Sequence, residues 1–367
     1  MRLAALLLTW SQAAFAGGQA GDGSFPAPSN VRGAEYPKIH PDLRVTFRLR
    51  APSAQKIQVV PQNAGLGKSP FEMTRGEDGF WTVTTPPVRP GFHYYHPLVD
   101  GVPVNDPGSE TYFGWAKQTS GLEVPDPALD FYQAKPVPHG EVRIRYYHAT
   151  TTGALRRAYV YAPPDYDAHP KARYPVLYLQ HGSGESERAW TTQGRANFIL
   201  DNLIAAGKAR PMILIMENGY AAKIGAPPSS TGRGTKGFQD LVLHDLIPVI
   251  DSAYRTLADR KHRAIAGLSM GAGQALEIAL ANPDKFGCAG AFSGAGRSLD
   301  LKAAGAANFR LLWLGCGVED RLYAGGKAIH AALDQAGVKH VWFEGPGEHE
   351  WQVWRKHLAA FAPLLFR

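Results

Sequence analysis

Two different patterns of apolar and polar residues divide the chain. Over residues 28–120, short segments alternate apolar with polar positions and are separated by turn residues, as in LRVTFRLRA (43–51) and GFWTVTT (79–85). Alternation with a period of two is typical of strands that bury one face. We therefore predict a small all-β sandwich over residues 28–120.

From residue 141 onward, continuous apolar runs alternate with segments of helical periodicity. YPVLYLQ (174–180) and HRAIAGL (262–268) are apolar along most of their length, whereas QDLVLHDLIPVIDSAY (239–254) repeats its apolar residues with the period of a helix. Strands buried on both faces are typical of parallel sheets that helices cover on both sides. The pattern predicts an α/β fold, a doubly wound and mostly parallel sheet, over residues 141–367.

The segment between these regions, residues 121–140, contains four prolines and shows no clear periodicity. Prolines and turn residues without periodicity are typical of connecting segments. We interpret residues 121–140 as a linker.

The first 16 residues have the features of a signal peptide. A positive start at Met1 and Arg2 is followed by a short apolar run and by Ala14-Phe15-Ala16, a small-residue cleavage pattern. We therefore expect residues 1–16 to be removed and the protein to be secreted or periplasmic. The apolar run is too short to span a bilayer, and we expect no membrane span.

Composition and charge limit the classes of partner. Apolar residues make up 44% of the chain and charged residues 19%, as in ordinary globular proteins. The net charge of +7 is not concentrated in any run of five lysines or arginines, so we expect no nucleic-acid partner.

Cys288 and Cys316 are the two cysteines of the chain, and each lies in an apolar, strand-like segment. We predict two buried free thiols, with a disulfide as the alternative for an exported protein. Two cysteines do not make a disulfide framework or a cysteine zinc site.

The segment Gly267-Leu268-Ser269-Met270-Gly271 follows a predicted strand and opens a predicted helix. In this context a G-x-S-x-G motif bends the chain sharply and exposes the serine as a nucleophile. The two flanking glycines are expected because side chains would crowd the turn. Gly273 is expected to allow close packing of the helix on the sheet.

A serine nucleophile needs a base, and the base needs an acid to orient it. Asp320 and His349 follow Ser269 in chain order, and each comes at or just after the end of a predicted strand. The carboxyl ends of parallel strands meet at one edge, so these three side chains can converge. We predict Ser269, Asp320 and His349 as catalytic, with Glu319 as the alternative acid.

A tetrahedral intermediate also needs hydrogen-bond donors for its oxyanion. We predict the backbone amide of Met270, at a helix N-terminus, and that of Ser183, in the loop His181-Gly182-Ser183-Gly184. Gly184 is the alternative donor. The segment HEWQV does not form the H-E-x-x-H metal motif, and phosphate-cradling motifs are absent, so we expect no metal and no cofactor.

Several segments together give the chain a family resemblance. LYLQHGSGESERAW, AIAGLSMGAGQALEIALANPDKF, LWLGCGVEDRLY and GEHEWQVWRKHL resemble, in this order, esterase D-like α/β-hydrolases, above all carbohydrate esterase family 1, the feruloyl and acetylxylan esterases. The resemblance covers roughly residues 140–367. It implies the same three catalytic residues and adds Trp190 and Trp351, beside Gly184, as substrate-binding residues.

The earlier segment GFWTVTTPPVRPGFHYYHPLVDGVPVNDP (79–107) resembles the immunoglobulin-like module that precedes glycogen-branching and isoamylase-type enzymes. The resemblance implies a carbohydrate-binding module over residues 28–120. Flat aromatic rings suit sugar faces, although aromatic residues more often fill a sandwich core. The candidates for such a platform are Trp81, Tyr94, Tyr95, Tyr112 and Trp115.

Together with the signal-peptide pattern, the resemblance implies a secreted serine ester hydrolase that forms an acyl-enzyme and acts on plant cell-wall polysaccharide. The expected reaction removes feruloyl groups, with acetyl groups as a further option, from xylan. One alternative is a siderophore esterase that acts on a catechol trilactone, because such enzymes also join a β-sandwich to this kind of hydrolase. Another is a non-catalytic carbohydrate-binding protein, which the intact Ser, Asp, His order argues against.

Overall fold

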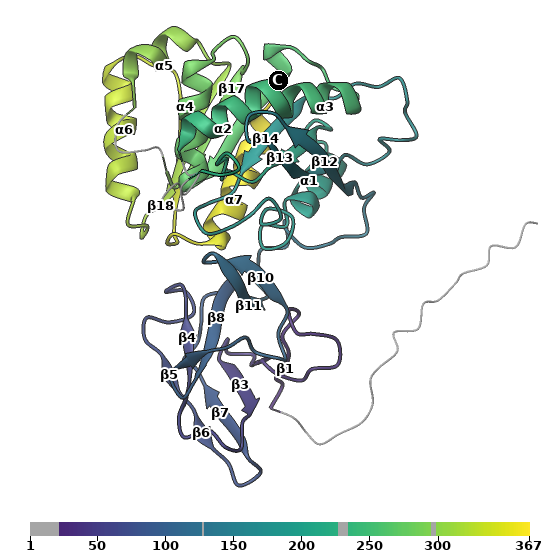
Figure 1. Ribbon diagram of the computed structural model, residues 1–367. Coiled ribbons are helices and arrows are strands. Elements are labelled where there is room, and N and C mark those ends of the chain that lie inside the picture. Colours follow the sequence, from purple (N-terminus) through teal and green to yellow (C-terminus); the bar gives the residue numbers. More distant parts are fainter. Residues whose placement is uncertain (1–21, 127, 227–233, 295–298) are drawn as a thin grey trace, which may run out of the picture.

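The computed structural model describes residues 22–126, 128–226, 234–294 and 299–367. These residues form an all-β region followed by an α/β region that packs against it (Figure 1). The predicted fold class is confirmed. The predicted signal peptide, residues 1–16, lies outside the described residues.

The all-β region contains two antiparallel sheets. One has the order β1 (Phe25–Pro26), β2 (Lys38–Ile39), β3 (Val45–Arg50), β7 (Phe80–Thr84), β6 (Thr74–Arg75). The other has the order β10 (Thr111–Gly114), β11 (Lys117–Val124), β8 (Gly91–Val99), β4 (Ile57–Pro61), β5 (Phe71–Glu72), with β9 (Val102–Pro103) paired to β8.

The two sheets share one apolar core because their strands alternate buried and accessible residues. In β3, Val45, Phe47 and Leu49 are buried, while the residues between them are partly accessible. The rings of Phe47 and Tyr95, one from each sheet, lie 4.8 Å apart. The alternation seen in the sequence therefore corresponds to the inward face of a two-layer structure.

The boundary with the linker differs from the prediction. Strand β11 continues to Val124, so residues 121–124 belong to the all-β region and not to the predicted linker of residues 121–140. Gly121 resembles a turn signal in the sequence, but it lies inside the strand. A Cβ atom at Gly121 would lie 2.4 Å from the ring of Tyr112, so the glycine makes room for an aromatic side chain.

The α/β region is built on an eight-stranded sheet. Its order is β12 (Glu141–Ala149), β13 (Ala154–Ala162), β15 (Ile213–Met216), β14 (Val176–Gln180), β16 (Arg263–Leu268), β17 (Cys288–Phe292), β18 (Leu311–Gly317), β19 (Val341–Gly345). The pairs β12–β13 and β13–β15 are antiparallel, and all later pairs are parallel. Cys288 and Cys316 are free and buried, as predicted.

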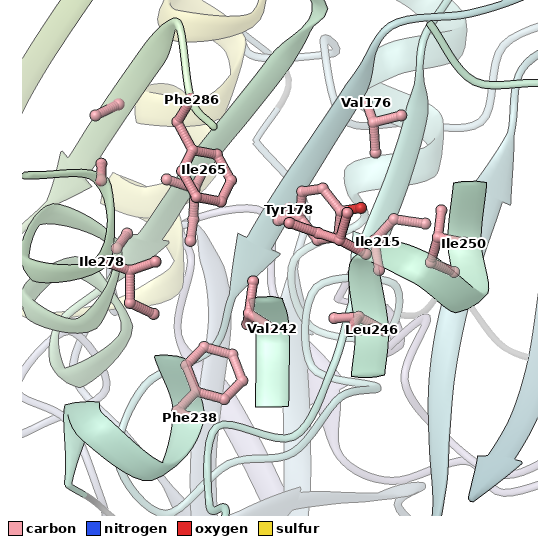
Figure 2. Close-up of a cluster of buried hydrophobic side chains, with 14 of the residues drawn as sticks. Val176, Tyr178, Ile215, Phe238, Val242, Leu246, Ile250, Ile265, Ile278 and Phe286 are labelled. Carbon is pink, nitrogen blue, oxygen red and sulfur yellow. The ribbon is translucent and has the colours of Figure 1, made fainter. Parts of the chain in front are cut away.

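Helices cover both faces of this sheet. Side chains of α1 (Ala196–Ala205) and α7 (Trp351–Phe361) pack in the apolar core of one face. The other face is covered by α2 (Thr235–Leu241), a π-helical turn η1 (Val242–Leu246), α3 (Ile247–Ala253), α4 (Met270–Ala281), α5 (Leu301–Ala307) and α6 (Tyr323–Gln335). Figure 2 shows Tyr178, Ile215 and Ile265 of the strands among apolar side chains of these helices. Short 3-10 turns lie at Arg260–His262 and Ala362–Leu364.

None of the helices in the described ranges has the length and apolar character that a membrane span requires.

A buried ion pair joins the two regions. Arg355 of α7 donates from Nη1 and Nη2 to the two carboxylate oxygens of Glu123 of β11, at 2.9 and 2.8 Å. Both side chains are almost completely buried. Burial opposes the charge of Glu123, but the adjacent guanidinium outweighs it and lowers the pKa of Glu123. Removal of one partner would leave an uncompensated charge in the interface.

We expect Glu123→Ala to lower the free energy of unfolding by about 3–5 kcal/mol because it leaves the Arg355 guanidinium buried and unpaired. Denaturant unfolding measures this loss. The control is Asp42→Ala, which breaks the exposed ion pair with Arg44 and should leave the unfolding midpoint nearly unchanged. Equal midpoints for the two variants would contradict the assigned role of the buried pair.

Candidate active site

The candidate site lies where the direction of strand order changes. The chain passes from β14 through α1 to β15 on one side, and then returns through α2 and α3 to β16 on the other side of β14. The loops that leave the carboxyl ends of β14 and β16 therefore diverge and open a crevice between them. These are the loops that carry residues 181–184 and Ser269.

The backbone at Ser269 is bent as the motif predicts. Ser269 has φ 51° and ψ −114°, a conformation that residues other than glycine rarely adopt. A Cβ atom at Gly267 would lie 2.5 Å from the carbonyl oxygen of Gly271, and one at Gly271 would lie 2.5 Å from that of His181. The strained turn therefore requires glycine at both positions. Gly273 does not have the predicted packing role, because a Cβ atom there would meet nothing within 4 Å.

The structure brings Ser269, His349 and Asp320 together. His349 Nε2 lies 2.9 Å from Ser269 Oγ, and His349 Nδ1 lies 2.8 Å from Asp320 Oδ2. Because a carboxylate only accepts, Nδ1–H donates to Asp320, and Nε2 is left to accept the serine hydroxyl proton. This tautomer suits a base that removes a proton from Ser269.

Asp320, and not Glu319, contacts the histidine. Glu319 accepts a hydrogen bond from the backbone amide of Gly347. Burial tends to raise the pKa of Asp320, but the hydrogen bond and charge of His349 and the backbone amide of Leu322 outweigh it, so the pKa lies below its ordinary value. Asp320 is therefore a carboxylate that can orient and stabilise the imidazole ring.

The loop after β14 packs directly against the serine. A Cβ atom at Gly182 would lie 3.5 Å from Ser269 Cβ, so this loop approaches the nucleophile closely. His181 fixes the turn: Nδ1 lies 2.7 Å from the Gly182 carbonyl, and Nε2 accepts from the amide of Gly219 at 3.0 Å. Burial lowers the pKa of His181 to about 4. The ring is therefore neutral and structural near neutral pH.

The predicted oxyanion donors lie at this point. Ser183 lines the same cavity as Ser269, and among the described residues its amide has no hydrogen-bond partner. Met270 is the first residue of α4, where amides have no carbonyl partner within the helix. The amide of Gly184 donates to the hydroxyl of Tyr220, which favours Ser183 over Gly184 as the second donor.

A cavity of about 420 Å³ lies above Ser269 and His349, and both regions of the chain line it. The all-β region contributes Gln62, Asn63, Phe92, Tyr94, Trp115 and Ala116, and the α/β region contributes Gly182, Ser183, Gly184, Glu185, Leu268, Ser269, Arg321, His349, Glu350, Trp351 and Trp354. The predicted substrate-binding residues Trp351 and Gly184 are in this lining.

The prediction for Trp190 is wrong, since this residue does not line the cavity. Its side chain is buried, and its indole nitrogen donates to the carbonyl of Gln180 at 3.0 Å. The ring packs edge-on against Trp351 and Phe292. A tryptophan near an active-site loop can face the core as well as the cavity, and the sequence does not distinguish the two.

Glu185 is a site residue that sequence reasoning missed. Its carboxyl group accepts from Tyr94 Oη at 3.1 Å, Trp351 Nε1 at 2.9 Å and the Gly182 amide at 3.2 Å. It thereby connects the loop beside Ser269, the helix that follows His349 and the all-β region. Burial raises the pKa of Glu185 to about 7, against the three donors that lower it. Its sequence context, a polar loop, gives no sign of this burial.

The all-β region also holds the segment that carries His349. The next residue, Glu350, is buried and forms an ion pair with Arg89. Glu350 also accepts from Asn63 Nδ2 at 3.2 Å. The histidine loop is therefore fixed by two residues that lie more than 250 positions earlier in the chain, at sequence separations of 261 and 287.

One group of side chains in the described ranges could hold a metal ion. His330, Asp334 and His340 place one ligand atom each within 4.8 Å of one another, although His330 Nδ1 and His340 Nε2 already form a 2.8 Å hydrogen bond. None of the three lines the cavity above Ser269. The arrangement at Ser269 needs no metal to generate its nucleophile.

Glu185→Gln is expected to reduce the dependence of stability on pH. Because the folded pKa of about 7 exceeds the ordinary 4.5, the folded state binds more protons between these values. The free energy of unfolding contributed by this group therefore falls as pH rises from about 4.5 to 7, by about 3 kcal/mol in total. Denaturant unfolding at pH 5 and pH 8 should show a smaller difference in Glu185→Gln. The surface control Glu72→Gln should keep the wild-type difference in unfolding free energy between the two pH values. An equal difference in both variants would refute the raised pKa of Glu185.

Comparisons with known proteins show that the chain is similar to esterases. The family model described as "Putative esterase" matches residues 149–314. The endo-1,4-beta-xylanase/feruloyl esterase of Xylanibacter ruminicola is 38% identical over 352 residues, which cover 93% of this chain and 47% of the relative. An esterase of Mycobacterium tuberculosis is 34% identical over 135 residues, 37% of this chain and 28% of that protein. The chain thus spans less than half the length of these curated relatives.

Solved structures give the same fold. The ferulic acid esterase of Anaeromyces mucronatus, solved in complex with ferulic acid, is 25% identical, with a TM-score of 0.56 over 65% of this chain and 96% of that chain. The enterobactin esterase of Shigella flexneri is 17% identical and shares the fold, with a TM-score of 0.67 over 87% of this chain and 92% of that chain. The chain therefore has the α/β-hydrolase fold, and residues 149–314 are similar to the esterase family model.

Proposed function

We propose that this protein is a serine carboxylic-ester hydrolase that removes feruloyl groups from plant cell-wall xylan. The observation that carries the proposal is the hydrogen-bonded series Ser269, His349, Asp320 at the base of a cavity shared by both regions. The xylanase/feruloyl esterase of Xylanibacter ruminicola, which matches 93% of this chain, supports the acyl group and the polymer.

The reaction follows from the geometry. Ser269 Oγ attacks the ester carbonyl carbon while His349 Nε2 takes the hydroxyl proton, and the Asp320 carboxylate stabilises the imidazolium that forms. The amides of Ser183 and Met270 stabilise the oxyanion. His349 then gives its proton to the leaving alcohol oxygen, which produces the acyl-enzyme. A water molecule, deprotonated by His349, attacks this ester, and the acid leaves as Ser269 regains its proton.

The cavity lining supports an aromatic acyl group. Phe92, Tyr94, Trp351 and Trp354 present four aromatic side chains to the space beside Ser269. All four are buried, so their rings are held in place before a substrate arrives. Planar aromatic groups pack well against such rings. An acetyl group would leave much of a cavity of about 420 Å³ unfilled, which is why we favour feruloyl over acetyl.

Two further elements of the proposal rest on sequence. The signal-peptide pattern of residues 1–16 supports action outside the cytoplasm, in a secreted or periplasmic protein. The resemblance of residues 79–107 to an immunoglobulin-like module supports a carbohydrate-binding role for the all-β region. Plant cell-wall polysaccharide is the corresponding partner.

A second candidate function is hydrolysis of a catechol trilactone. It is favoured by the fold of the enterobactin esterase, which matches 87% of this chain and therefore includes both regions. The 17% identity of that match supports the fold alone, whereas the feruloyl esterase relative is 38% identical over nearly the whole chain.

A comparison of four ester substrates distinguishes these functions. We expect the highest kcat/KM on methyl ferulate and feruloylated arabinoxylan. The value on acetylated xylan should be lower because the cavity is lined by fixed aromatic rings. The value on a catechol trilactone should be lower because the feruloyl esterase relative is more similar in sequence than the enterobactin esterase. Release of ferulate and acetate is measured by chromatography. Faster hydrolysis of the trilactone than of methyl ferulate would favour the second function, and inactivity on both polymers would exclude plant xylan.

Ser269→Ala should lower kcat on methyl ferulate by about 10³-fold or more, because the nucleophile is lost while the fold remains. Asp320→Asn should lower kcat by about 10³–10⁴-fold, since an amide no longer holds the required tautomer of His349. The matched control, Ser252→Ala on the exposed side of α3, should retain wild-type kcat. Activity of the Ser269 variant within tenfold of wild type would disprove the serine mechanism.

A further inference from the structure

The tip of the β10–β11 hairpin reaches the cavity from the all-β region. Trp115 and Ala116 form the two-residue turn between Gly114 and Lys117, and both line the cavity that contains Ser269. Figure 1 shows β10 and β11 at the end of the all-β region that faces the α/β region. This turn takes no part in the acyl-transfer steps at Ser269.

Direct contacts hold the hairpin on the α/β region. The amide of Ala116 donates to the carbonyl of Gly184 at 2.8 Å, and Gln193 Nε2 donates to the carbonyl of Phe113 at 3.2 Å. Gly184 has φ +81°, and a Cβ atom there would lie 3.2 Å from Trp115 Cα. The missing side chain thus allows a close approach between the turn and the loop that carries Ser183. Trp115 is therefore positioned relative to the reacting serine.

The conformation of Trp115 is unusual for its type. Trp115 has φ 58° and Ala116 has φ 62°, in a turn where glycine and asparagine are favoured. A bulky residue in this region is an outlier that needs a compensating reason. Burial of the side chain does not compensate for this strain, because Trp115 is 57% exposed. The other tryptophans of the described residues are buried or partly buried. Contact between the indole ring and a ligand would compensate for this backbone strain.

The position of the ring indicates which part of a substrate it contacts. The buried rings of Phe92, Tyr94, Trp351 and Trp354 surround the inner space, which suits the acyl group. A polysaccharide chain cannot enter a cavity of about 420 Å³, so the sugar that carries the ester stays at its mouth. Trp115, which lines the cavity but remains 57% exposed, lies on that outer side.

We propose that Trp115 forms a carbohydrate subsite of the esterase, in which its indole ring stacks on the sugar that carries the scissile ester. This inference rests on the proposed function and deepens it. It gives the all-β region a role in recognising the alcohol side of the ester at the catalytic centre itself. The acyl side is recognised by other residues.

The test compares two substrates with the same acyl group, a feruloylated arabinoxylo-oligosaccharide and methyl ferulate. The measured quantity is the ratio of kcat/KM on the sugar ester to kcat/KM on the methyl ester. Trp115→Ala should lower this ratio about tenfold, a factor in the range of a lost aromatic stacking contact. Trp115→Phe, which keeps a flat ring, should keep the ratio within about threefold of wild type.

The matched control is Tyr146→Ala. Tyr146 is an aromatic residue of β12 with a similar exposure, 56%, and it does not line the cavity. Its loss should leave the ratio as in wild type. A ratio within twofold of wild type in Trp115→Ala would overturn the proposal, and so would equal losses on both substrates, which would mean that Trp115 only shapes the cavity. Failure of the proposed function is seen separately, as inactivity of the wild-type protein on methyl ferulate, and would overturn both.

Discussion

The sharp turn at Ser269 is the constraint on which the site depends. A residue with φ 51° and ψ −114° between β16 and α4 is sterically possible here only because Gly267 and Gly271 have no side chains. This turn directs the serine hydroxyl to the carboxyl edge of the parallel sheet. Asp320 and His349 follow the adjacent strands β18 and β19 to the same edge. The sheet topology and one strained residue thus bring together three side chains that are distant in sequence.

The all-β region is part of this site and is not merely attached to it. Arg89 and Asn63 hold Glu350, the residue after His349, and Tyr94 contacts Glu185 beside the loop of residues 181–184. Helix α7, which begins directly after this segment, is fixed by a buried ion pair with β11. A substrate therefore meets a cavity with walls from both regions. Stability and catalysis should respond together to changes in this interface.

The sequence predicted the parts of the structure that depend on local pattern. The fold class follows from alternation over residues 28–120 and continuous apolar runs after residue 141. The order of Ser269, Asp320 and His349 at strand ends predicted which side chains converge. The extent of β11 was missed because Gly121 resembles a turn residue. The orientation of Trp190 was predicted wrongly because a tryptophan near an active-site loop can face the core as well as the cavity. The contacts of Glu185 were not predicted because they depend on how the two regions pack. Trp115 was one of five aromatic candidates for sugar stacking, and the sequence did not single it out.

The most direct test of the catalytic account is to label the resting enzyme with an organophosphate and locate the adduct by peptide mass spectrometry. The account predicts one adduct per chain, on Ser269, formed much more slowly in His349→Ala because the serine then lacks its base. Saturation with ferulate should slow labelling by occupying the cavity. An adduct on another residue, or labelling of Ser269 that does not depend on His349, would contradict it.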